Sequence, residues 1–417
     1  MIQIERVLII AVMKDKSDEE RFHYSISELE ALANTANGTI VESIIQKRLT
    51  PHRATYLGEG KLQEVKELTE DEDIDVVIAN EELSGSQIRN LQEELQVRVI
   101  DRSQLILDIF ASRARTKEGK LQVELAQYAY MLPRLHGQGT ELSRLGGGIG
   151  TRGPGETKLE TDRRHIQRRM DEIKQRLKSV VNQREQYRDN RRKNQLFQIA
   201  VVGYTNAGKS TMFNNLTKSE SLQEDKLFAT LDPLTRKMHL PSGLEVIITD
   251  TVGFIQDLPT ALIAAFRSTL EEVKEADLIL HVIDVAAPDR DNHESTVLNL
   301  LDELDASSIP VITLYNKKDL INGENFVPNS HPYMLLSALE EKDLMQLKCD
   351  IEKVIQNLWE SYHCVIPEGN GKVLSKLKQY TIMDKETYQD HLLGYEVSGF
   401  VDPNHPIMKE IKEYHQE

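Results

Sequence analysis

The strongest chemical signal in the chain is a glycine-rich run, Gly203-Tyr-Thr-Asn-Ala-Gly208-Lys209-Ser210, with the spacing G-x-x-x-x-G-K-[ST]. It follows an apolar stretch at 197–202 and precedes a helical stretch at 211–217, the context that a phosphate-binding loop requires. The glycines let backbone N–H groups wrap the β-phosphate, the lysine neutralises β- and γ-oxygens, and the serine hydroxyl can ligate Mg²⁺. The predicted nucleotide-binding residues here are Gly203, Tyr204, Thr205, Asn206, Ala207, Gly208, Lys209, Ser210 and Thr211.

A second motif, Asp250-Thr-Val-Gly253, comes directly after a predicted strand at 244–249. Asp250 is placed to hold Mg²⁺ through water, and the amide of Gly253 can meet the γ-phosphate. Alone, D-x-x-G usually means a turn. At this distance after a phosphate-binding loop, it indicates the second part of the same site, with Mg²⁺ as the expected cofactor.

The segment between these motifs contains Phe228-Ala-Thr230-Leu-Asp-Pro. A threonine in this window can close on Mg²⁺ and the γ-phosphate and let go after hydrolysis. We place Thr230 in that role, with Thr235 as the alternative, and assign Phe228 to the nucleotide site. The predicted metal ligands are Ser210, Thr230 and Asp250, and the predicted catalytic residues are Lys209, Thr230 and Gly253.

A third motif, Asn316-Lys317-Lys318-Asp319, follows a predicted strand at 311–315. A carboxylate there can accept from both N1–H and N2–H of guanine, whereas adenine has no such donor pair. Asp319 would therefore select GTP, with Asn316 and Lys317 beside it. After the next predicted strand, a backbone amide within Ser337-Ala338-Leu339 can meet guanine O6. All these motifs follow strands, where open α/β sheets bind ligands.

One expected side chain is missing. After the glycine of D-x-x-G many GTPases place a glutamine that orients the attacking water, but here the residue is Phe254. We therefore expect slow intrinsic hydrolysis that a partner or an ion must stimulate. Asn206 is a candidate K⁺ ligand, and the equal alternative is that asparagine simply suits the turn of the loop.

These motifs require a set of parallel strands to position them. Strands are predicted at 197–202, 244–249, 278–285, 311–315 and 333–336, with a closing helix at 343–362. They define a Ras-like P-loop GTPase domain at 196–366. Residues 367–371 are expected to be a linker within a small C-terminal α+β domain at 367–417.

The first 112 residues show a second strand–helix alternation, which indicates a parallel-sheet α/β domain. Strands are predicted at 6–12, 39–46, 75–79 and 98–101, and helices at 26–36, 62–68 and 84–96, the last capped by Ser84. Between the two α/β domains, residues 113–195 form a predicted two-helix, coiled-coil-like linker with a glycine-rich loop at 134–157. The fold class is thus multidomain α/β.

Composition limits the remaining possibilities. Two cysteines in 417 residues exclude a disulfide scaffold, and no apolar run approaches the roughly 18 residues of a spanning helix. The N-terminal residues form a predicted strand rather than a signal peptide. We expect a soluble, cytoplasmic protein, and a monomer because no long heptad seam is present. The net charge is −16, yet residues 134–193 carry 16 Lys and Arg against 8 Asp and Glu. That segment can meet RNA phosphates.

Several segments together resemble the HflX family of translational GTPases. They include IGTRGPGETKLETDRRH (149–165), YLGEGKL (56–62), VIDRSQLILDIFASRA (99–114), FATLDP (228–233) and DTVGFIQDLPTALIAAFRSTLEEV (250–273). The resemblance covers about residues 1–360. It implies a GTPase that binds the large (50S) ribosomal subunit, brings its loop toward 23S rRNA at the peptidyl-transferase region, and splits stalled or idle 70S particles.

The resemblance also implies where RNA is bound. The candidate RNA-binding residues are Arg144 and Arg152 in the loop, and Arg163, Arg164, Arg168 and Arg169 at the head of the following helix. The alternative for that helix is a solvated charged face. Two other roles stay open: a ribosome-bound protection or hibernation factor, such as one that gives antibiotic resistance, and a large-subunit assembly factor.

Two features of the chain bear on the family's known roles. Gly139 stands where relatives often have an aromatic residue, which puts base stacking by the loop tip in doubt. The family's amino-terminal domain has been linked to adenine nucleotides and RNA. Here Gly58-Glu-Gly60-Lys61 lacks the spacing of a phosphate-binding loop, so a structural turn is favoured over a second nucleotide site.

Overall fold

The computed structural model describes residues 4–14, 19–135, 161, 163–180, 196–218, 228, 233–255, 272–321 and 326–414. The chain divides into two compact units. The first contains Met1–Gln183, Glu224–Asp232 and Phe254–Ser268, and the second contains Arg184–Gln223, Pro233–Gly253 and Thr269–Glu417. Within the part of the chain that is described, no helix is long and apolar enough to cross a membrane.

The first unit is built on a four-stranded sheet in the order β2-β1-β3-β4, and every neighbouring pair is parallel. This confirms the predicted parallel sheet. The central strand β1 is buried from Val7 onward, because an apolar run can be covered on both faces by helices. The strands are β1 (Glu5–Met13), β2 (Gly38–Lys47), β3 (Val76–Ala79) and β4 (Arg98–Asp101).

Five labelled helices belong to this unit, and the predicted cap at Ser84 is present. The Ser84 hydroxyl accepts from the amide of Gln87, whose side chain bonds back to the Ser84 amide, and this pair fixes the start of α3. The helices are α1 (Glu19–Thr35), α2 (Glu59–Asp71), α3 (Gly85–Leu95), α4 (Arg102–Arg113) and α5 (Lys117–Arg134). Residues 163–180 are helical and lie after the loop of the predicted two-helix linker at 113–195.

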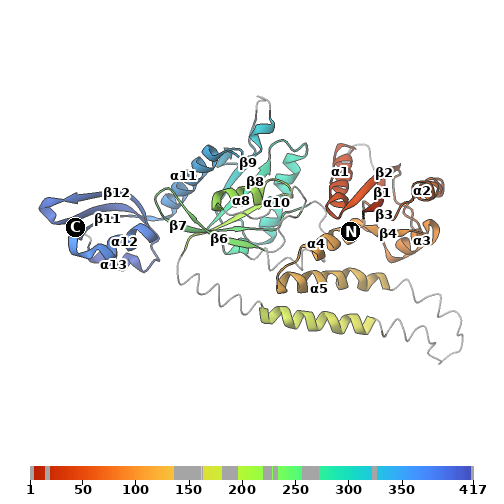
Figure 1. The fold of residues 1–417 in the computed structure, drawn as a ribbon, viewed down its shortest axis with the longest axis horizontal. Helices are drawn as coiled ribbons and strands as arrows, with labels where there is room; N and C mark the ends of the chain where they lie inside the picture. Colours follow the sequence, from red (N-terminus) through yellow and green to blue (C-terminus); the bar gives the residue numbers. More distant parts are fainter. Residues whose placement is uncertain are drawn as a thin grey trace. The chain divides into compact units, whose positions relative to one another are not determined.

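The second unit contains a six-stranded sheet in the order β10-β9-β8-β5-β7-β6 (Figure 1). Five strands match predicted ones: β5 (Gln198–Gly203), β7 (Glu245–Asp250), β8 (Leu278–Asp284), β9 (Val311–Asn316) and β10 (Tyr333–Leu335). The edge strand β6 (Leu234–His239) was not predicted and runs antiparallel to β7. Only Met238 of β6 is buried, so its sequence shows little apolar alternation and its pairing with β7 defines it.

Helices α8 (Lys209–Thr217), α10 (Arg290–Glu303) and α11 (Glu341–Leu358) accompany this sheet, and the short helix η2 (Lys318–Leu320) follows β9. Alternate residues of β8 pack with α8 and α11 in one core: Leu278, Leu280 and Val282 from the strand meet Met212 and Leu347 from the helices. The sheet therefore holds the carboxyl ends of β5, β7, β8 and β9 at one edge, which positions the predicted motifs together.

A three-stranded antiparallel sheet, β11-β13-β12, completes the second unit (Figure 1). The expected helix to Tyr362 is wrong at its end: α11 stops at Leu358, and Tyr362, Cys364 and Ile366 alternate into a core as part of a strand. The segment expected as a linker at 367–371 holds a short helix, η3 (Glu368–Asn370). The other elements are β11 (Glu360–Pro367), α12 (Gly371–Tyr380), β12 (Ile382–Gln389), η4 (Asp390–Leu392), β13 (Gly394–Val401) and α13 (Ile407–Glu413).

Candidate functional site

The glycine-rich run connects β5 to α8, as its spacing predicts. Gly208 has φ +94°, and a Cβ there would lie 2.2 Å from Nδ2 of Asn316. A Cβ at Gly203 would lie 2.2 Å from the carbonyl oxygen of Val282. Glycine is therefore required at both positions. The loop ends at the N-terminus of α8, where free backbone N–H groups favour an anion.

Lys209 is buried at the start of α8, with 6% of its surface exposed. Its Nζ donates to the carbonyl oxygen of Tyr204 at 2.6 Å. Burial lowers the pKa of Lys209 to about 8, against the opposing effect of Asp250. A buried ammonium with a lowered pKa is stabilised by an anion that enters the site, and phosphate oxygens would supply that charge.

Asp250 and Gly253 come to the same place from the end of β7. Asp250 is fully buried, and its Oδ2 accepts from the Ser210 hydroxyl at 2.9 Å. A Cβ at Gly253 would lie 3.1 Å from Nζ of Lys209, so the backbone of the D-x-x-G motif runs directly past the lysine. A hydroxyl and a carboxylate side by side fit Mg²⁺, which takes one or two carboxylates together with substrate phosphates.

Asn316 holds the third motif against the first. Its Nδ2 donates to the carbonyl oxygen of Ala207, and its Oδ1 accepts from the amide of Ala338, both at 2.8 Å. This buried side chain thus connects the glycine-rich loop to Ser337-Ala338-Leu339. Asp319 lies beyond it in η2 and is exposed. The structure therefore brings three of the predicted motifs to one edge of the sheet.

Two contributors to this region were missed in the sequence. Asp284, at the end of β8, pairs with Nζ of Lys317 at 2.7 Å. His293 of α10 stacks on the ring of Tyr204. A polar residue directly after a buried strand on the same sheet edge could have indicated Asp284, whereas nothing in the local sequence indicates His293.

Comparison with known proteins identifies the family. Three family models match the chain: a GTP-binding GTPase N-terminal region over residues 23–111, a GTP-binding GTPase middle region over 113–191, and a 50S ribosome-binding GTPase over 198–317. The chain is 53% identical to GTPase HflX of Alkalihalophilus pseudofirmus, across 98% of this chain and 97% of that protein. The chain belongs to the HflX family of GTPases.

Other HflX relatives and a solved structure agree with this membership. GTPase HflX of Escherichia coli is 41% identical, across 88% of this chain and 87% of that protein. The crystal structure of the SsGBP–GDP complex is 26% identical and matches with a TM-score of 0.50, covering 85% of this chain and 99% of that chain. The protein is accordingly a GTP hydrolase, as the motifs predict.

Other predicted HflX site residues are placed as follows. Phe254 is buried, with 2% exposed. Asn206 is exposed and has φ +59°, a backbone conformation that asparagine tolerates well, so the turn alternative gains support. Phe228 is buried in the first unit, where its ring meets the edge of Phe110 at a centroid distance of 4.6 Å. Thr230 lies outside the described residues.

Of the candidate RNA-binding residues, the loop arginines Arg144 and Arg152 also lie outside the described residues. Three helix arginines, Arg163, Arg164 and Arg168, are exposed. Arg169 instead pairs with Glu124 of α5 at 2.9 Å and with Glu172 at 3.3 Å. The structure thus shows three exposed arginines on this helix, whereas Arg169 ties the helix to α5.

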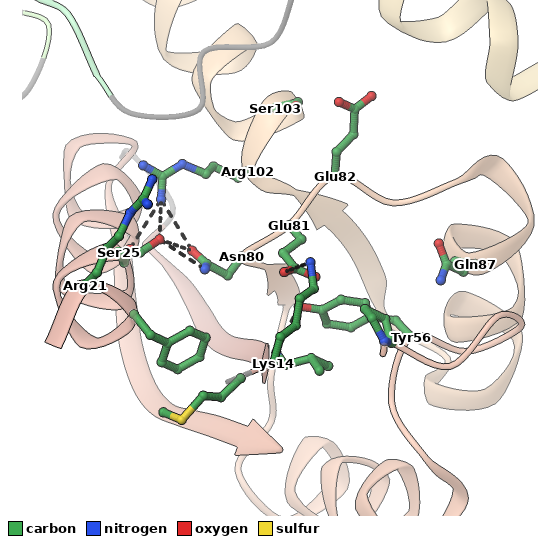
Figure 2. A pocket seen from close by; sticks show the side chains of 14 residues that line it. Lys14, Arg21, Ser25, Tyr56, Asn80, Glu81, Glu82, Gln87, Arg102 and Ser103 are labelled. Carbon is green, nitrogen blue, oxygen red and sulfur yellow. Dashed lines mark hydrogen bonds and ion pairs between the residues drawn. The ribbon is translucent and has the colours of Figure 1, made fainter. Parts of the chain in front are cut away.

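The amino-terminal unit has a pocket of about 730 Å³ at the carboxyl ends of its strands (Figure 2). Gly58, Gly60 and Lys61 are not among its lining residues. Gly58 instead is the N-cap residue of α2, and Lys61 pairs with Glu64 on that helix at 2.8 Å. These contacts support the structural-turn interpretation of the cluster.

Two of the cations that line this pocket have carboxylate partners. Lys14 pairs with Glu81 at 2.8 Å, and the buried Arg102 pairs with Glu28. Figure 2 shows Arg102 also pointing at Ser25 and Asn80, to which it donates hydrogen bonds. Two of the three cations that line the pocket are therefore paired with carboxylates, and the third, Arg21, has no ion pair among the described residues.

Proposed function

We propose that this protein is a ribosome-stimulated GTPase that acts on the large subunit and splits stalled or idle 70S ribosomes. GTP binding drives the separation of the subunits, and hydrolysis resets the affinity of the protein for the ribosome. The observation that carries this proposal is the match of residues 198–317 to a family described as 50S ribosome-binding GTPases. Near full-length similarity to GTPase HflX proteins supports it.

In the proposed mechanism, backbone amides of the glycine-rich loop and Nζ of Lys209 bind the β- and γ-phosphates. Ser210, Asp250 and Thr230 would hold Mg²⁺, which neutralises charge on the phosphates when bound. The amide of Gly253 faces the γ-phosphate from beside Lys209. The 2.9 Å contact between Ser210 and Asp250 supports the metal assignment.

The guanine base is proposed to bind at the end of β9. Asp319 accepts from N1–H and N2–H, while Asn316 keeps the base loop in register with the phosphate loop through Ala207. The ion pair between Lys317 and Asp284 holds the lysine in place. Ser337, Ala338 and Leu339 supply the amide for guanine O6, and Thr211 completes the proposed GTP set, which omits Phe228 because that ring packs against Phe110 in the first unit.

Hydrolysis is expected to be slow without a partner because Phe254 has no group that can orient water. The large subunit is the proposed activator. Docking would use the exposed arginines at the head of helix 163–180 together with the loop arginines Arg144 and Arg152, which approach rRNA phosphates. K⁺ at Asn206 is a further proposed stimulus.

The first test measures GTP hydrolysis by the purified full chain with buffer, free 50S subunits or 70S ribosomes, in potassium and in sodium. A low basal rate that rises strongly with 50S or 70S supports the proposal. A rise that requires potassium assigns Asn206 its ligand role. A rate that is already high without ribosomes, or indifferent to them, overturns the activation argument based on Phe254.

The second test asks what GTP binding accomplishes. Subunit separation of 70S particles is followed by sedimentation with GTP, GDP and a slowly hydrolysed GTP analogue. Splitting with GTP and with the analogue, but not with GDP, supports binding-driven work. Stable occupancy of intact 70S would favour protection or hibernation instead, and preference for immature large subunits would favour assembly.

A further inference from the structure

Two aromatic rings stack directly behind the phosphate-binding loop. The rings of Tyr204 and His293 lie with centroids 3.7 Å apart and planes 10° from parallel, which is van der Waals contact over a full face. Both residues are buried, with 3% and 4% of their surfaces exposed. Tyr204 belongs to the loop and His293 to α10, so the stack joins two elements 89 positions apart in the chain.

Tyr204 is the residue on which Lys209 rests. Its carbonyl oxygen accepts from Nζ of Lys209 at 2.6 Å and from the amide of Ala207 at 3.3 Å. A rotation of the Tyr204 backbone would therefore move the ammonium and the turn of the loop together. The ring of Tyr204 opposes that rotation, because it packs face to face on the ring of His293.

Helix α10 is in turn fixed to the strand that carries the guanine motif. Glu294, next to His293, accepts from the hydroxyl of Tyr315 in β9 at 3.1 Å. Asn316 follows Tyr315 directly, so one helix contacts the phosphate loop through one residue and the base-binding strand through the next. The imidazole is neutral at neutral pH, because burial lowers the pKa of His293 against the opposing effects of Asp289 and Asp284.

We propose that His293 is a positioning residue for nucleotide binding: its ring clamps Tyr204, and through the Tyr204 carbonyl it sets the place of the Lys209 ammonium. The inference rests on the GTP hydrolase assignment and the phosphate role of Lys209, and is independent of any ribosome. The ring face carries the role, so another flat aromatic ring should substitute for imidazole, while an aliphatic side chain of similar volume should not.

The test measures equilibrium dissociation constants for GDP and GTP on the full chain, with kcat, KM and thermal unfolding of each variant. For His293→Leu we expect Kd for GDP and GTP to rise in parallel by roughly three- to tenfold, the worth of an aromatic stack. KM should rise with them while kcat changes less. His293→Phe should stay within about twofold of the parent protein.

A matched control separates clamping from loss of core packing. Leu301 is buried on the same helix, and Leu301→Ala should lower the melting temperature without weakening GDP binding beyond about twofold. Adding His293→Leu to Tyr204→Leu should not raise Kd for GDP and GTP further, because Tyr204→Leu already removes the ring stack.

Three results would overturn the proposal. His293→Leu could leave the affinity for GDP and GTP unchanged. His293→Phe could weaken binding as much as His293→Leu. Leu301→Ala could lose affinity in proportion to its loss of stability. If none of the variants or the parent chain bound GDP, the nucleotide assignment itself would fail, which is a distinct outcome.

Discussion

The two larger sheets of this protein each carry polar residues at the carboxyl ends of their parallel strands, where the strand order reverses, yet the cations at the two places have different partners. In the first unit, Lys14 follows β1 and pairs with Glu81, and Arg102 follows β4 and pairs with Glu28. Beyond β5 in the second unit, Lys209 is buried and its ammonium donates to the backbone carbonyl of Tyr204. Topology alone marks both crevices as places where ligands bind.

The different partners of these cations indicate what makes such a crevice suitable for binding phosphate. A cation already paired with a carboxylate must lose that partner before it binds an anion, and the loss cancels much of the gain. A buried lysine that rests on a neutral carbonyl keeps its charge for the ligand. The lowered pKa of Lys209, about 8, reflects that unmet demand.

The largest expected effect comes from opening the buried pair in the first unit. Glu28→Gln leaves Arg102 buried without its counter-charge, and we expect the free energy of unfolding of this unit to fall by about 3–5 kcal/mol. Urea unfolding, followed by hydrogen exchange in α1 and α4, measures it. Glu72→Gln is the control, since its pair with Arg6 is exposed and worth about 1 kcal/mol or less. A loss below about 1 kcal/mol for Glu28→Gln would show that Arg102 does not depend on Glu28 as its counter-charge.

The next effect compares one lysine from each crevice. Lys209→Ala removes the ammonium that we propose binds the phosphates, so Kd for GDP and GTP should rise by at least about 100-fold and hydrolysis should fall with it. Lys14→Ala should change the same constants by less than about twofold, because Glu81 already holds that lysine. Equal losses from both substitutions would break the comparison.

A third effect concerns His281, which is buried beside the nucleotide site in β8. Within the described part of the chain neither ring nitrogen has a hydrogen-bond partner, and burial, with a smaller effect of Lys209, lowers its pKa to about 3. The unfolded state binds a proton below about pH 6.5 and the folded state does not, so stability is present above that pH and lost as pH falls.

We expect this loss to approach about 1.4 kcal/mol per pH unit between roughly pH 6 and pH 4. Urea midpoints measured across that range give the slope, and His281→Leu should flatten it. The exposed His239 serves as the control, and His239→Leu should leave the slope as it is. A parent slope unchanged by His281→Leu would assign the acid sensitivity to other groups.

The smallest effect is the pH dependence of nucleotide binding. Only the ammonium form of Lys209 binds phosphate well, and its folded pKa is about 8, so affinity is full below pH 8 and falls as pH rises through it. From pH 7 to about pH 8.5 the Kd for GDP should rise about fourfold. Guanosine lacks phosphates and should show no such change. An equal change for guanosine would point to the base instead of Lys209.

Much of the nucleotide site was predictable because each motif is local. The glycine-rich loop has its spacing, its preceding strand and its following helix within 20 residues, and the backbone demands of Gly203 and Gly208 follow from that turn. Ser84 and Gln87 likewise cap α3 through contacts three residues apart. The ribosome was expected as a partner only from the family resemblance, because no local geometry indicates it.

Other features escaped because their cause lies far away in the chain. β6 forms a strand because it pairs with β7. Its own sequence gives little sign of a strand, since only one of its six residues is buried. The end of α11 at Leu358 follows from the pairing of β11 with β13, which no helical periodicity reveals. Arg169 shares its helix with exposed arginines, yet Glu124 on α5 binds it.

The amino-acid sequence was enough to predict the chemistry that we propose for this protein: which residues wrap phosphates, hold Mg²⁺ and select guanine, and in what order they follow the strands of a sheet. The tertiary structure sets which of the cations pair with a carboxylate and which do not. Whether a lysine meets a carboxylate, as Lys14 does, or a carbonyl, as Lys209 does, depends on side chains brought together from distant elements. The stack of His293 on Tyr204 also depends on the tertiary structure. The spacing of residues within the loop or within α10 does not indicate which ring of the other element packs against them.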